Sequence, residues 1–178
     1  LEDHHDISLL TEQLTEPGEL EQFVSADIII GTALRAEHPI PKAARLYHVA
    51  GAGYDGINVK RLPQGCRLCN CFGHEDAIAE YVMAALLARH VPLVDADTRL
   101  RQGDWTYVAG RSNGLRQECS GGTIGLLGYG HIGKAVARCA KAFNMVVHVA
   151  NRSPISQDTN VDHYWPLPQL TAFYNAVD

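Results

Sequence analysis

Three glycines lie at the spacing Gly-x-Gly-x-x-Gly in the stretch GYGHIG, residues 128–133. An apolar run, TIGLL, comes before them, and a helical pattern of side chains follows. Gly128 would let the chain turn sharply after a strand, and Gly130 would let the backbone approach a ligand closely. Gly133 would let the following helix pack tightly against a sheet. This spacing is typical of a turn that holds a diphosphate.

The first helical residues after this turn add a second feature. The backbone N–H groups of His131 and Ile132 would point at an anion from the positive end of the helix. A second apolar run, MVVHVA, follows that helix. Because strand, glycine turn, helix and strand come in this order, the motif predicts a dinucleotide site; the alternative is a tight turn that holds no ligand.

The residues after the second strand bear on which dinucleotide would bind. A carboxylate there would accept hydrogen bonds from the ribose hydroxyls of NAD and would repel a 2′-phosphate. The chain has Asn151, Arg152 and Ser153 instead. Arg152 could form charge-assisted hydrogen bonds with a phosphate, and Ser153 could add a hydroxyl donor. We therefore expect NADP(H) to be favoured over NAD(H); the alternative is a surface loop with an incidental arginine.

The elements that must position these residues alternate between short apolar runs and helical patterns, which predicts an α/β fold with parallel strands. A short helix is expected from Pro17 to Val24 and a long one from residue 77 to 90. The long helix is apolar almost all round, so we expect it to be buried against more than one neighbour. Strands are expected at residues 7–10, 26–30, 45–50, 66–69, 123–128 and 145–150.

The helix after the glycine turn shows one apolar stripe with a charged face opposite. The stripe members, three and four residues apart, are Ile132, Val136, Cys139, Ala140 and Phe143. The charged residues are Lys134, Arg138 and Lys141. Residues 99–122 have the polar, glycine-containing composition of a connector, and residues 167–176 predict a short helix. Strand, helix, strand and short helix make about half of a dinucleotide-binding domain.

The composition limits the classes of partner. The 178 residues carry a formal net charge of -5 without a dense basic block, so we expect no nucleic-acid partner. The longest apolar run, residues 77–88, contains Glu80 and is too short to span a bilayer, so we expect no membrane association. Five cysteines, an odd number, favour a reducing compartment such as the cytoplasm. Leu1 is not an initiator residue, so a missing N-terminal piece stays an open alternative.

Cys66, Cys69, Cys71 and His74 form a C-x2-C-x-C-x2-H run that could be a zinc site. Two of these cysteines fall in an expected parallel strand, which would have to curl around the metal to form a tetrahedral site. Free cysteine commonly behaves as a small buried hydrophobic residue. We therefore expect no metal site.

Four stretches resemble the D-2-hydroxyacid dehydrogenase family, and together they cover most of the chain. Their order and spacing are specific, although no single stretch is decisive. They are HVAGAGYDGINV (48–59), NCFGHEDAIAEYVMAALLA (70–88), RQGDW (101–105) and the run from 121 to 154. The resemblance implies a flavodoxin-like substrate domain, residues 1–82, and an incomplete Rossmann domain with a doubly wound parallel sheet, residues 83–178. The reaction would take place in the cleft between them.

The resemblance also assigns roles to individual residues. Backbone N–H groups of Gly51, Ala52 and Gly53 would bind the substrate carboxylate, which agrees with the anion-binding nest that glycines after a strand can form. Without the resemblance, a simple glycine loop is an equal alternative. Asp76 would contact the nicotinamide end of the cofactor, where the family usually has Ser or Thr; as a helix cap it would need no ligand.

The family's catalytic Arg and its Glu–His pair would lie beyond Asp178, so we expect this chain to be part of an enzyme and to hold no catalytic residue itself. Three histidines are candidates for a substitute proton donor. His148 falls within a strand, His131 lies in the phosphate turn, and His74 is more typical of a loop. None of the three is therefore assigned to catalysis.

We expect an oxidoreductase that transfers a hydride between NADP(H) and a small 2-keto or 2-hydroxy acid such as glyoxylate or hydroxypyruvate, and we expect a homodimer. A formate- or phosphite-type dehydrogenase is the alternative within the same fold. From a different class comes a non-catalytic NAD(P)-sensing regulatory protein. An α/β domain that binds no nucleotide is a third alternative.

Overall fold

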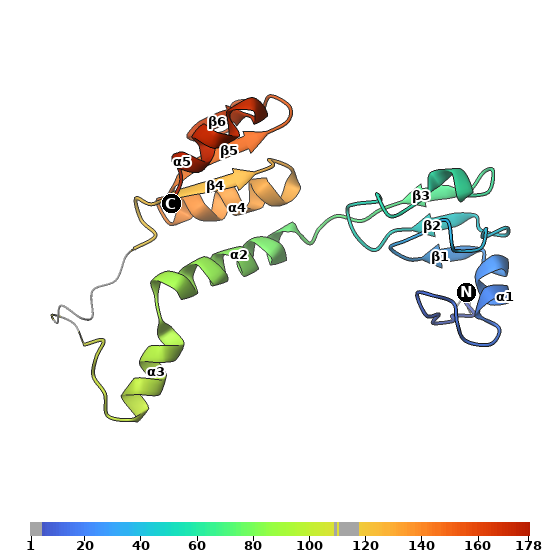
Figure 1. Cartoon of the computed structure of the whole chain (residues 1–178), viewed down its shortest axis with the longest axis horizontal. Coiled ribbons are helices and arrows are strands. Elements are labelled where there is room, and N and C mark those ends of the chain that lie inside the picture. Colours follow the sequence, from blue (N-terminus) through green and yellow to red (C-terminus); the bar gives the residue numbers. More distant parts are fainter. Residues whose placement is uncertain (1–4, 109, 111–117) are drawn as a thin grey trace. The chain divides into compact units, whose positions relative to one another are not determined.

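The computed structural model describes residues 5–108, 110 and 118–178. The chain divides into two compact units, Leu1–Gly73 and His74–Asp178 (Figure 1). Each unit has a three-stranded parallel sheet and a hydrophobic core of its own. The boundary expected between residues 82 and 83 falls inside the first helix of the second unit.

The first unit is built on a sheet with the order β1-β2-β3. Its elements are α1 (Glu19–Ser25), β1 (Ile28–Ile30), β2 (Leu46–His48), the 3-10 helix η1 (Val59–Arg61) and β3 (Arg67–Cys69). Ile28, Leu46 and Arg67 are aligned across the three strands. Three predicted strands therefore exist and are parallel, but each is shorter than the apolar run that predicted it.

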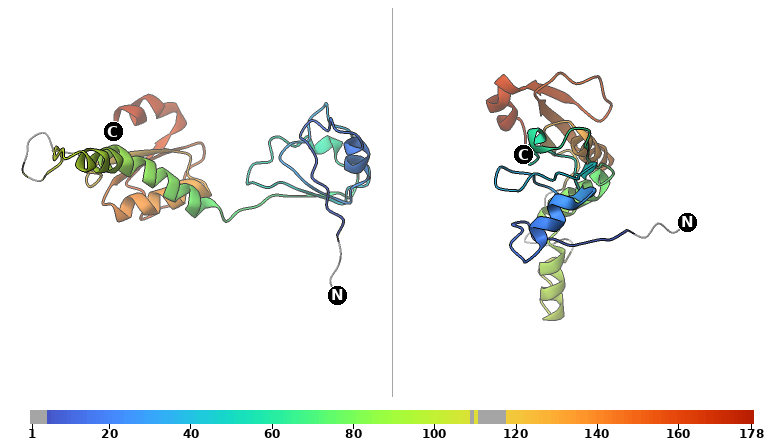
Figure 2. Two further views of the ribbon diagram at one scale, coloured as in Figure 1. Left: turned by 90° about the horizontal axis from the view of Figure 1, so that it is seen from below. Right: turned by 90° about the vertical axis from the view of Figure 1, so that its right-hand side faces the viewer.

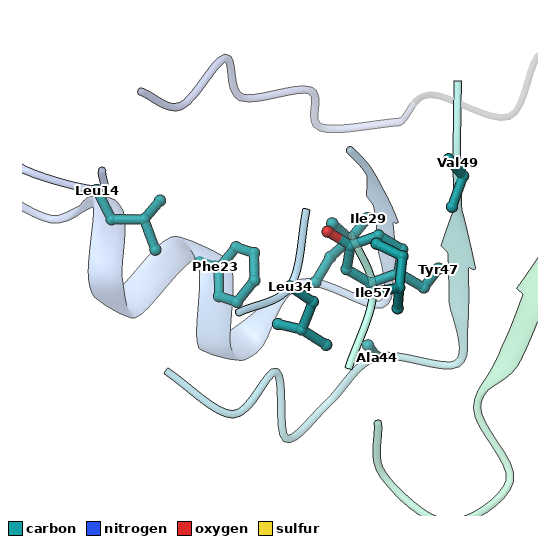
Figure 3. Packing of buried hydrophobic residues seen from close by; sticks show 8 residues of the cluster. All are labelled: Leu14, Phe23, Ile29, Leu34, Ala44, Tyr47, Val49 and Ile57. Carbon is teal, nitrogen blue, oxygen red and sulfur yellow. The ribbon is translucent and has the colours of Figure 1, made fainter. Parts of the chain in front are cut away.

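One face of this sheet carries the core of the first unit (Figure 3). Its buried members are Leu14, Phe23, Ile29, Leu34, Ala44, Tyr47, Val49 and Ile57. The hydroxyl of buried Tyr47 donates to the carbonyl oxygen of Ala33 over 2.8 Å, which satisfies its polar end. The strand expected at residues 7–10 is wrong: no neighbouring strand pairs with it, and Ile7 and Leu9 are 81% and 97% exposed.

The second unit has a sheet with the order β4-β5-β6. Its elements are α2 (Glu75–His90), α3 (Leu93–Arg101), β4 (Thr123–Leu127), α4 (His131–Ala142), β5 (Val146–Asn151), β6 (His163–Pro166), η3 (Leu167–Gln169) and α5 (Leu170–Asn175). The connector expected at residues 99–122 begins as the end of α3, and its residues 109 and 111–117 lie outside the described residues. Strand β6 was not predicted; its four residues HYWP become a strand by pairing with β5.

Helix α4 lies against both its own sheet and α2, which runs alongside it (Figure 2). Val136 is buried as predicted, but Ile132 and Phe143 at the ends of the expected stripe are 38% and 40% exposed. Ala135 is buried instead, in a cluster that also contains Ala79 of α2. A helix with two neighbours buries two sides, and alanines let both neighbours come close.

Helix α2 was expected to be buried against several neighbours, but among the described residues only Ala79 and Met83 are buried in it. Its bare face consists of Ala77, Tyr81, Ala84, Ala85 and Ala88, all exposed. Within the described residues no single helix has the length and apolar character needed to cross a membrane. The pair α2 and α3, bent by 50°, meets those two criteria only when both helices are counted together.

Candidate functional site

The glycine turn joins the end of β4 to the start of α4. Gly128 has φ of +101°, a conformation that side chains rarely adopt, and its N–H donates to the carbonyl oxygen of Ala150 in β5 over 2.8 Å. A Cβ atom at Gly133 would overlap the carbonyl oxygen of Gly128. The backbone therefore requires both glycines: Gly128 because of its positive φ, and Gly133 because the first turn of the helix lies directly against Gly128.

Gly130 differs from these two glycines, because a Cβ atom there would meet nothing within 4 Å. Its φ of -84° is also open to other residues, so neither backbone strain nor a neighbour in the structure requires glycine. Helix α4 begins at the next residue, His131, and its N-cap residue, Gly130, makes no side-chain capping hydrogen bond. Open space over an uncapped helix N-terminus fits the diphosphate of a dinucleotide, which accepts hydrogen bonds from backbone N–H groups there.

His131 lies at the start of α4, close to the start of α2. Its Nδ1 is 3.9 Å from Oε1 of Glu75, whose side chain is 16% exposed while that of His131 is 70% exposed. The imidazole therefore points toward solvent and a carboxylate. Ile132 follows it with an exposed side chain.

Asn151 ends β5 and connects the turn with the loop that follows β5. Its carboxamide oxygen accepts a hydrogen bond from the backbone N–H of Tyr129 over 3.3 Å. Its carboxamide nitrogen donates to the carbonyl oxygen of Ser153 over 2.9 Å. A carboxylate could not make the second contact, because it has no proton to donate. Arg152 and Ser153 follow with exposed side chains.

A second hydrogen bond joins the same loop to the turn. The hydroxyl of Tyr129 donates to Oδ2 of Asp158 over 2.7 Å. The backbone N–H and the side-chain amide of Asn160 donate to the other oxygen, at 2.9 and 3.0 Å. The Asn160 backbone N–H and the Tyr129 hydroxyl lower the pKa of Asp158. Burial and the neighbouring carboxylate raise the pKa of Tyr129, so it stays a neutral donor.

A pocket of about 240 Å³ lies between the turn and this loop. It is lined by Tyr129, Lys134, Asn151, Pro154, Ile155, Ser156, Gln157 and Asp158. The ammonium of Lys134 stands 5.9 Å from the centre of the Tyr129 ring. Sequence reasoning identified Asn151 here but missed Tyr129, Lys134 and Asp158. The only available signal was an aromatic residue inside the glycine motif, which does not indicate where its hydroxyl would point.

Asp76 lies in the first turn of α2, whose N-cap is His74, so it is not a cap itself. Its carboxylate is paired with the guanidinium of Arg138 on α4. Both side chains are largely exposed, at 75% and 62%. The pair joins the first turn of α2 to the second half of α4. Arg138, expected on a solvated face, therefore has a defined partner.

The loop Gly51, Ala52, Gly53 follows β2 in the first unit. The backbone N–H of Cys71 donates to the carbonyl oxygen of Gly51 over 3.1 Å. The side-chain amide of Asn70 donates to the carbonyl oxygen of Ala52 over 2.8 Å. Two carbonyl groups of the loop are thus held by the residues that follow β3. Asn70 begins the family-like stretch 70–88, but the sequence alone assigned it no role in this loop.

Among the described residues, no group of three or more His, Cys, Asp or Glu side chains is arranged to hold a metal ion. Cys66 is partly buried and packs against the core of the first unit, as expected for a small apolar side chain. Cys69 was expected to be buried too, but it is exposed. The reason is its position on β3, where it lies on the face of the sheet opposite the core.

Comparison with known proteins places this geometry in a family. A family model described as "D-isomer specific 2-hydroxyacid dehydrogenase, NAD binding domain" matches residues 83–178. A glyoxylate reductase of Korarchaeum cryptofilum is 31% identical over 170 residues, which are 93% of this chain and 46% of the relative. The chain spans about half the length of the curated relatives it matches.

Two solved structures show the same fold. A D-isomer specific 2-hydroxyacid dehydrogenase family protein from Aeromonas salmonicida has a TM-score of 0.71 at 24% identity, covering 89% of this chain and 50% of its own. An acyclic imino acid reductase, in complex with NADPH and D-Arg, has a TM-score of 0.63 at 27% identity, covering 81% and 47%. The family match covers more than half of the residues, from the interior of α2 to Asp178. The chain therefore belongs to the D-isomer specific 2-hydroxyacid dehydrogenases.

Proposed function

We propose that this chain is part of an oxidoreductase that transfers a hydride between NADP(H) and a small 2-keto or 2-hydroxy acid, of which glyoxylate and hydroxypyruvate are the leading examples. The observation that carries the proposal is the glycine turn, with open space over an uncapped helix start and a neutral Asn151 at the end of β5. The similarity to a glyoxylate reductase supports the substrate class.

The residues of the second unit would hold the cofactor. Backbone N–H groups of His131 and Ile132 would bind its diphosphate, with Gly130 leaving room for the close approach. Asp76, held by Arg138, would contact the nicotinamide end. The nicotinamide ring, when bound, supplies or accepts the hydride.

The residues of the first unit would hold the acid. Gly51, Ala52 and Gly53 would present backbone N–H groups to the substrate carboxylate. The hydrogen bonds from Cys71 and Asn70 to the loop carbonyls support this role, because they fix the loop without using its N–H groups. An arrangement that is fixed before binding loses less conformational freedom when the anion binds.

The preference for NADP(H) follows from charge. At the end of β5 a carboxamide replaces the carboxylate that would repel a 2′-phosphate, and the exposed Arg152 guanidinium follows it. A phosphate carries about −1.5 to −2 charges at neutral pH, so a charge-assisted hydrogen bond from Arg152 would be worth about 1.5 to 3 kcal/mol. The relative solved with NADPH supports the same preference.

We also propose that two copies of the protein associate through the bare face of α2. Its five members recur at helical spacing; four are alanines, and the fifth, Tyr81, is 76% exposed. Alanines would let a second helix approach closely, and Tyr81 would supply the large contact area. Helix α3 adds Leu93 and Val94, which are 72% and 82% exposed, and neighbouring exposed apolar side chains favour association.

The proposed compartment rests on the cysteines. All five are unpaired, and one of them, Cys69, is exposed. Free thiols persist where the surroundings keep them reduced. This state supports a reducing compartment such as the cytoplasm.

The proposed function is tested by two measurements. Calorimetric titration with NADPH and with NADH is expected to give a lower Kd for NADPH. Mixing the full-length enzyme, of which this chain is proposed to be a part, with NADPH and either glyoxylate or hydroxypyruvate is expected to consume NADPH. Absence of heat with both cofactors would remove the basis of the proposal, and binding without turnover by the full-length protein would favour a nucleotide sensor.

A further inference from the structure

The loop between β5 and β6 is held by side chains at its start and near its middle. At its start, the carboxamide of Asn151 binds the backbone of Tyr129 and of Ser153. Farther along, Asp158 accepts a hydrogen bond from the hydroxyl of Tyr129. One residue of the glycine turn, Tyr129, therefore holds the loop through its backbone at one point and through its side chain at another.

The Tyr129–Asp158 contact is specific in its geometry. Tyr129 is 7% exposed and is one of the residues that line the pocket. The two oxygens of Asp158 are both engaged, one by Tyr129 and the other by Asn160. A carboxylate with both oxygens engaged cannot rotate freely, so these hydrogen bonds anchor the loop at Asp158.

A carboxylate beside a phosphate site would ordinarily weaken phosphate binding by repulsion. Lys134 offsets this repulsion, because it lines the same pocket and its positive charge acts on Asp158. The pocket thus contains one fixed anion and one cation. Arg152, outside the pocket lining, adds a further positive charge at the start of the loop.

We infer that Tyr129 is a positioning residue for cofactor selection: its hydrogen bond to Asp158 holds the β5–β6 loop in the shape that presents Arg152 and Ser153 to a 2′-phosphate. The inference rests on the proposed NADP(H) preference and goes beyond it, because it assigns the selectivity to a residue that does not touch the phosphate. The hydroxyl of Tyr129 donates its hydrogen bond to Asp158, so Tyr129 would act on the ligand indirectly, through the loop.

The test uses two small probes of the adenosine half-site that differ in one group, 2′,5′-ADP and 5′-AMP. Calorimetry on the chain is expected to show tighter binding of 2′,5′-ADP. In Tyr129→Phe the ratio of the two Kd values is expected to shrink by about two- to tenfold, the factor that one hydrogen bond contributes. The Kd for 5′-AMP is expected to stay the same, because the turn and the helix start are unchanged.

Three further variants separate positioning from general damage. Asp158→Asn removes the negative charge but keeps the connection, since its amide can donate to the Tyr129 oxygen while its carbonyl accepts from Asn160, so the ratio is expected to be at least retained. Asp158→Ala removes the same charge and breaks the connection, so its ratio is expected to be lower than that of Asp158→Asn. Tyr164→Phe is the matched control, because it removes a neighbouring hydroxyl whose contact with the Asn151 carbonyl is long, at 3.4 Å.

The outcomes distinguish the two proposals. If the wild-type chain binds both probes equally, the NADP(H) preference fails and the positioning role fails with it. If the wild-type chain prefers 2′,5′-ADP and Tyr129→Phe keeps the full preference, only the positioning role is overturned. Equal weakening of both probes in Tyr129→Phe also overturns it, because a merely structural role would act on both ligands.

Discussion

The indole nitrogen of Trp165 donates a hydrogen bond to Nδ1 of His148 over 3.3 Å, joining β6 to β5 through two side chains. His148 is 8% exposed, and its ring centre lies 4.4 Å from that of His163. Burial, and then the nearby His163, lower the pKa of His148. The folded second unit therefore favours the neutral form of His148, whose Nδ1 accepts this hydrogen bond.

This preference predicts that the second unit loses stability as the medium becomes mildly acidic. The folded-state pKa is depressed, so the unfolded chain binds more protons than the folded chain once the pH falls below about 6.5. The free energy of unfolding should fall by up to about 1.4 kcal/mol per pH unit in that window. Urea unfolding followed by Trp165 fluorescence in a Trp105→Phe background, at several pH values, measures it.

The matched variant is His148→Gln, which keeps a side-chain acceptor but cannot titrate. Its stability should be nearly flat across the same window. Asp162 acts separately, because hydrogen bonding by the Val147 backbone and by Lys141 lowers its pKa, and its contribution is lost only below about pH 4. Identical slopes for wild type and His148→Gln above pH 5 would contradict the assignment to His148.

The sequence predicts most of this fold because local patterns decide where a strand is possible, but tertiary contacts decide whether it forms. The run 26–30 became β1 since β2 pairs with it, whereas residues 7–10 have no partner and form no strand. The converse holds for HYWP, in which β5 supplies the partner. Pairing between distant segments has no local signature.

The candidate site, like the fold, could be predicted only in part. The spacing of Gly128 and Gly133 predicts a glycine at each position, and the structure shows why the backbone needs them there. The contact from Tyr129 to Asp158 spans 29 residues and depends on how the loop after β5 folds back, so no local pattern contains it. From the sequence, Asn151 indicates only that no carboxylate ends the strand. Its hydrogen bond to the backbone of Tyr129 depends on the fold, which brings the glycine turn beside the end of β5.

Changing each of two glycines of the turn to alanine should affect a different property: Gly133→Ala the stability, and Gly130→Ala the binding of NADPH. Gly133→Ala places a Cβ against the Gly128 carbonyl oxygen and should lower the free energy of unfolding by about 1–3 kcal/mol or more. Gly130→Ala meets open space and should change stability by less than about 0.5 kcal/mol. It should nevertheless weaken NADPH binding about tenfold or more, because the methyl group occupies the space of the diphosphate.

Urea unfolding and calorimetry on both variants check this pair of expectations. A Gly130→Ala chain that binds NADPH as tightly as wild type would show that the diphosphate does not lie over this glycine. A Gly133→Ala chain of wild-type stability would show that the helix start can move away from the turn.

Asp162 predicts a second, local effect on stability. One of its oxygens accepts from the Val147 backbone at 2.7 Å, and Lys141 lies 2.9 Å away, so it joins α4, β5 and the start of β6. Asp162→Asn should lower the free energy of unfolding by about 1 kcal/mol, given its partial exposure. The control is Asp97→Asn, whose pair with Arg101 is exposed and should contribute at most about 0.5 kcal/mol. Equal losses in urea unfolding would refute the distinction.

The bare face of α2 predicts a change of oligomeric state. Tyr81→Glu combined with Ala85→Glu places two charges where exposed apolar side chains lie, and neither position is on the buried side of the helix. Light scattering after size-exclusion chromatography is expected to give a dimer mass for the wild type and a monomer mass for the variant. Lys42→Glu on the first unit serves as the charge control. A monomeric wild type at all concentrations would rule out the proposed association.

The end of β5 predicts that cofactor choice depends on two neighbouring residues. Arg152→Ala should weaken NADPH by about 1.5–3 kcal/mol and leave NADH nearly unchanged, because only NADPH carries the 2′-phosphate. Asn151→Asp should act in the same direction by repulsion, and it should also strengthen NADH, since a carboxylate accepts hydrogen bonds from both ribose hydroxyls. Asn151→Asp also removes the amide group that donates to the Ser153 carbonyl oxygen. Because this hydrogen bond is lost, the gain in NADH affinity should be smaller than the ribose contacts alone would give. Calorimetry with both cofactors on each variant separates the two effects, and an equal loss of both cofactors in Arg152→Ala would show that its guanidinium does not read the 2′-phosphate.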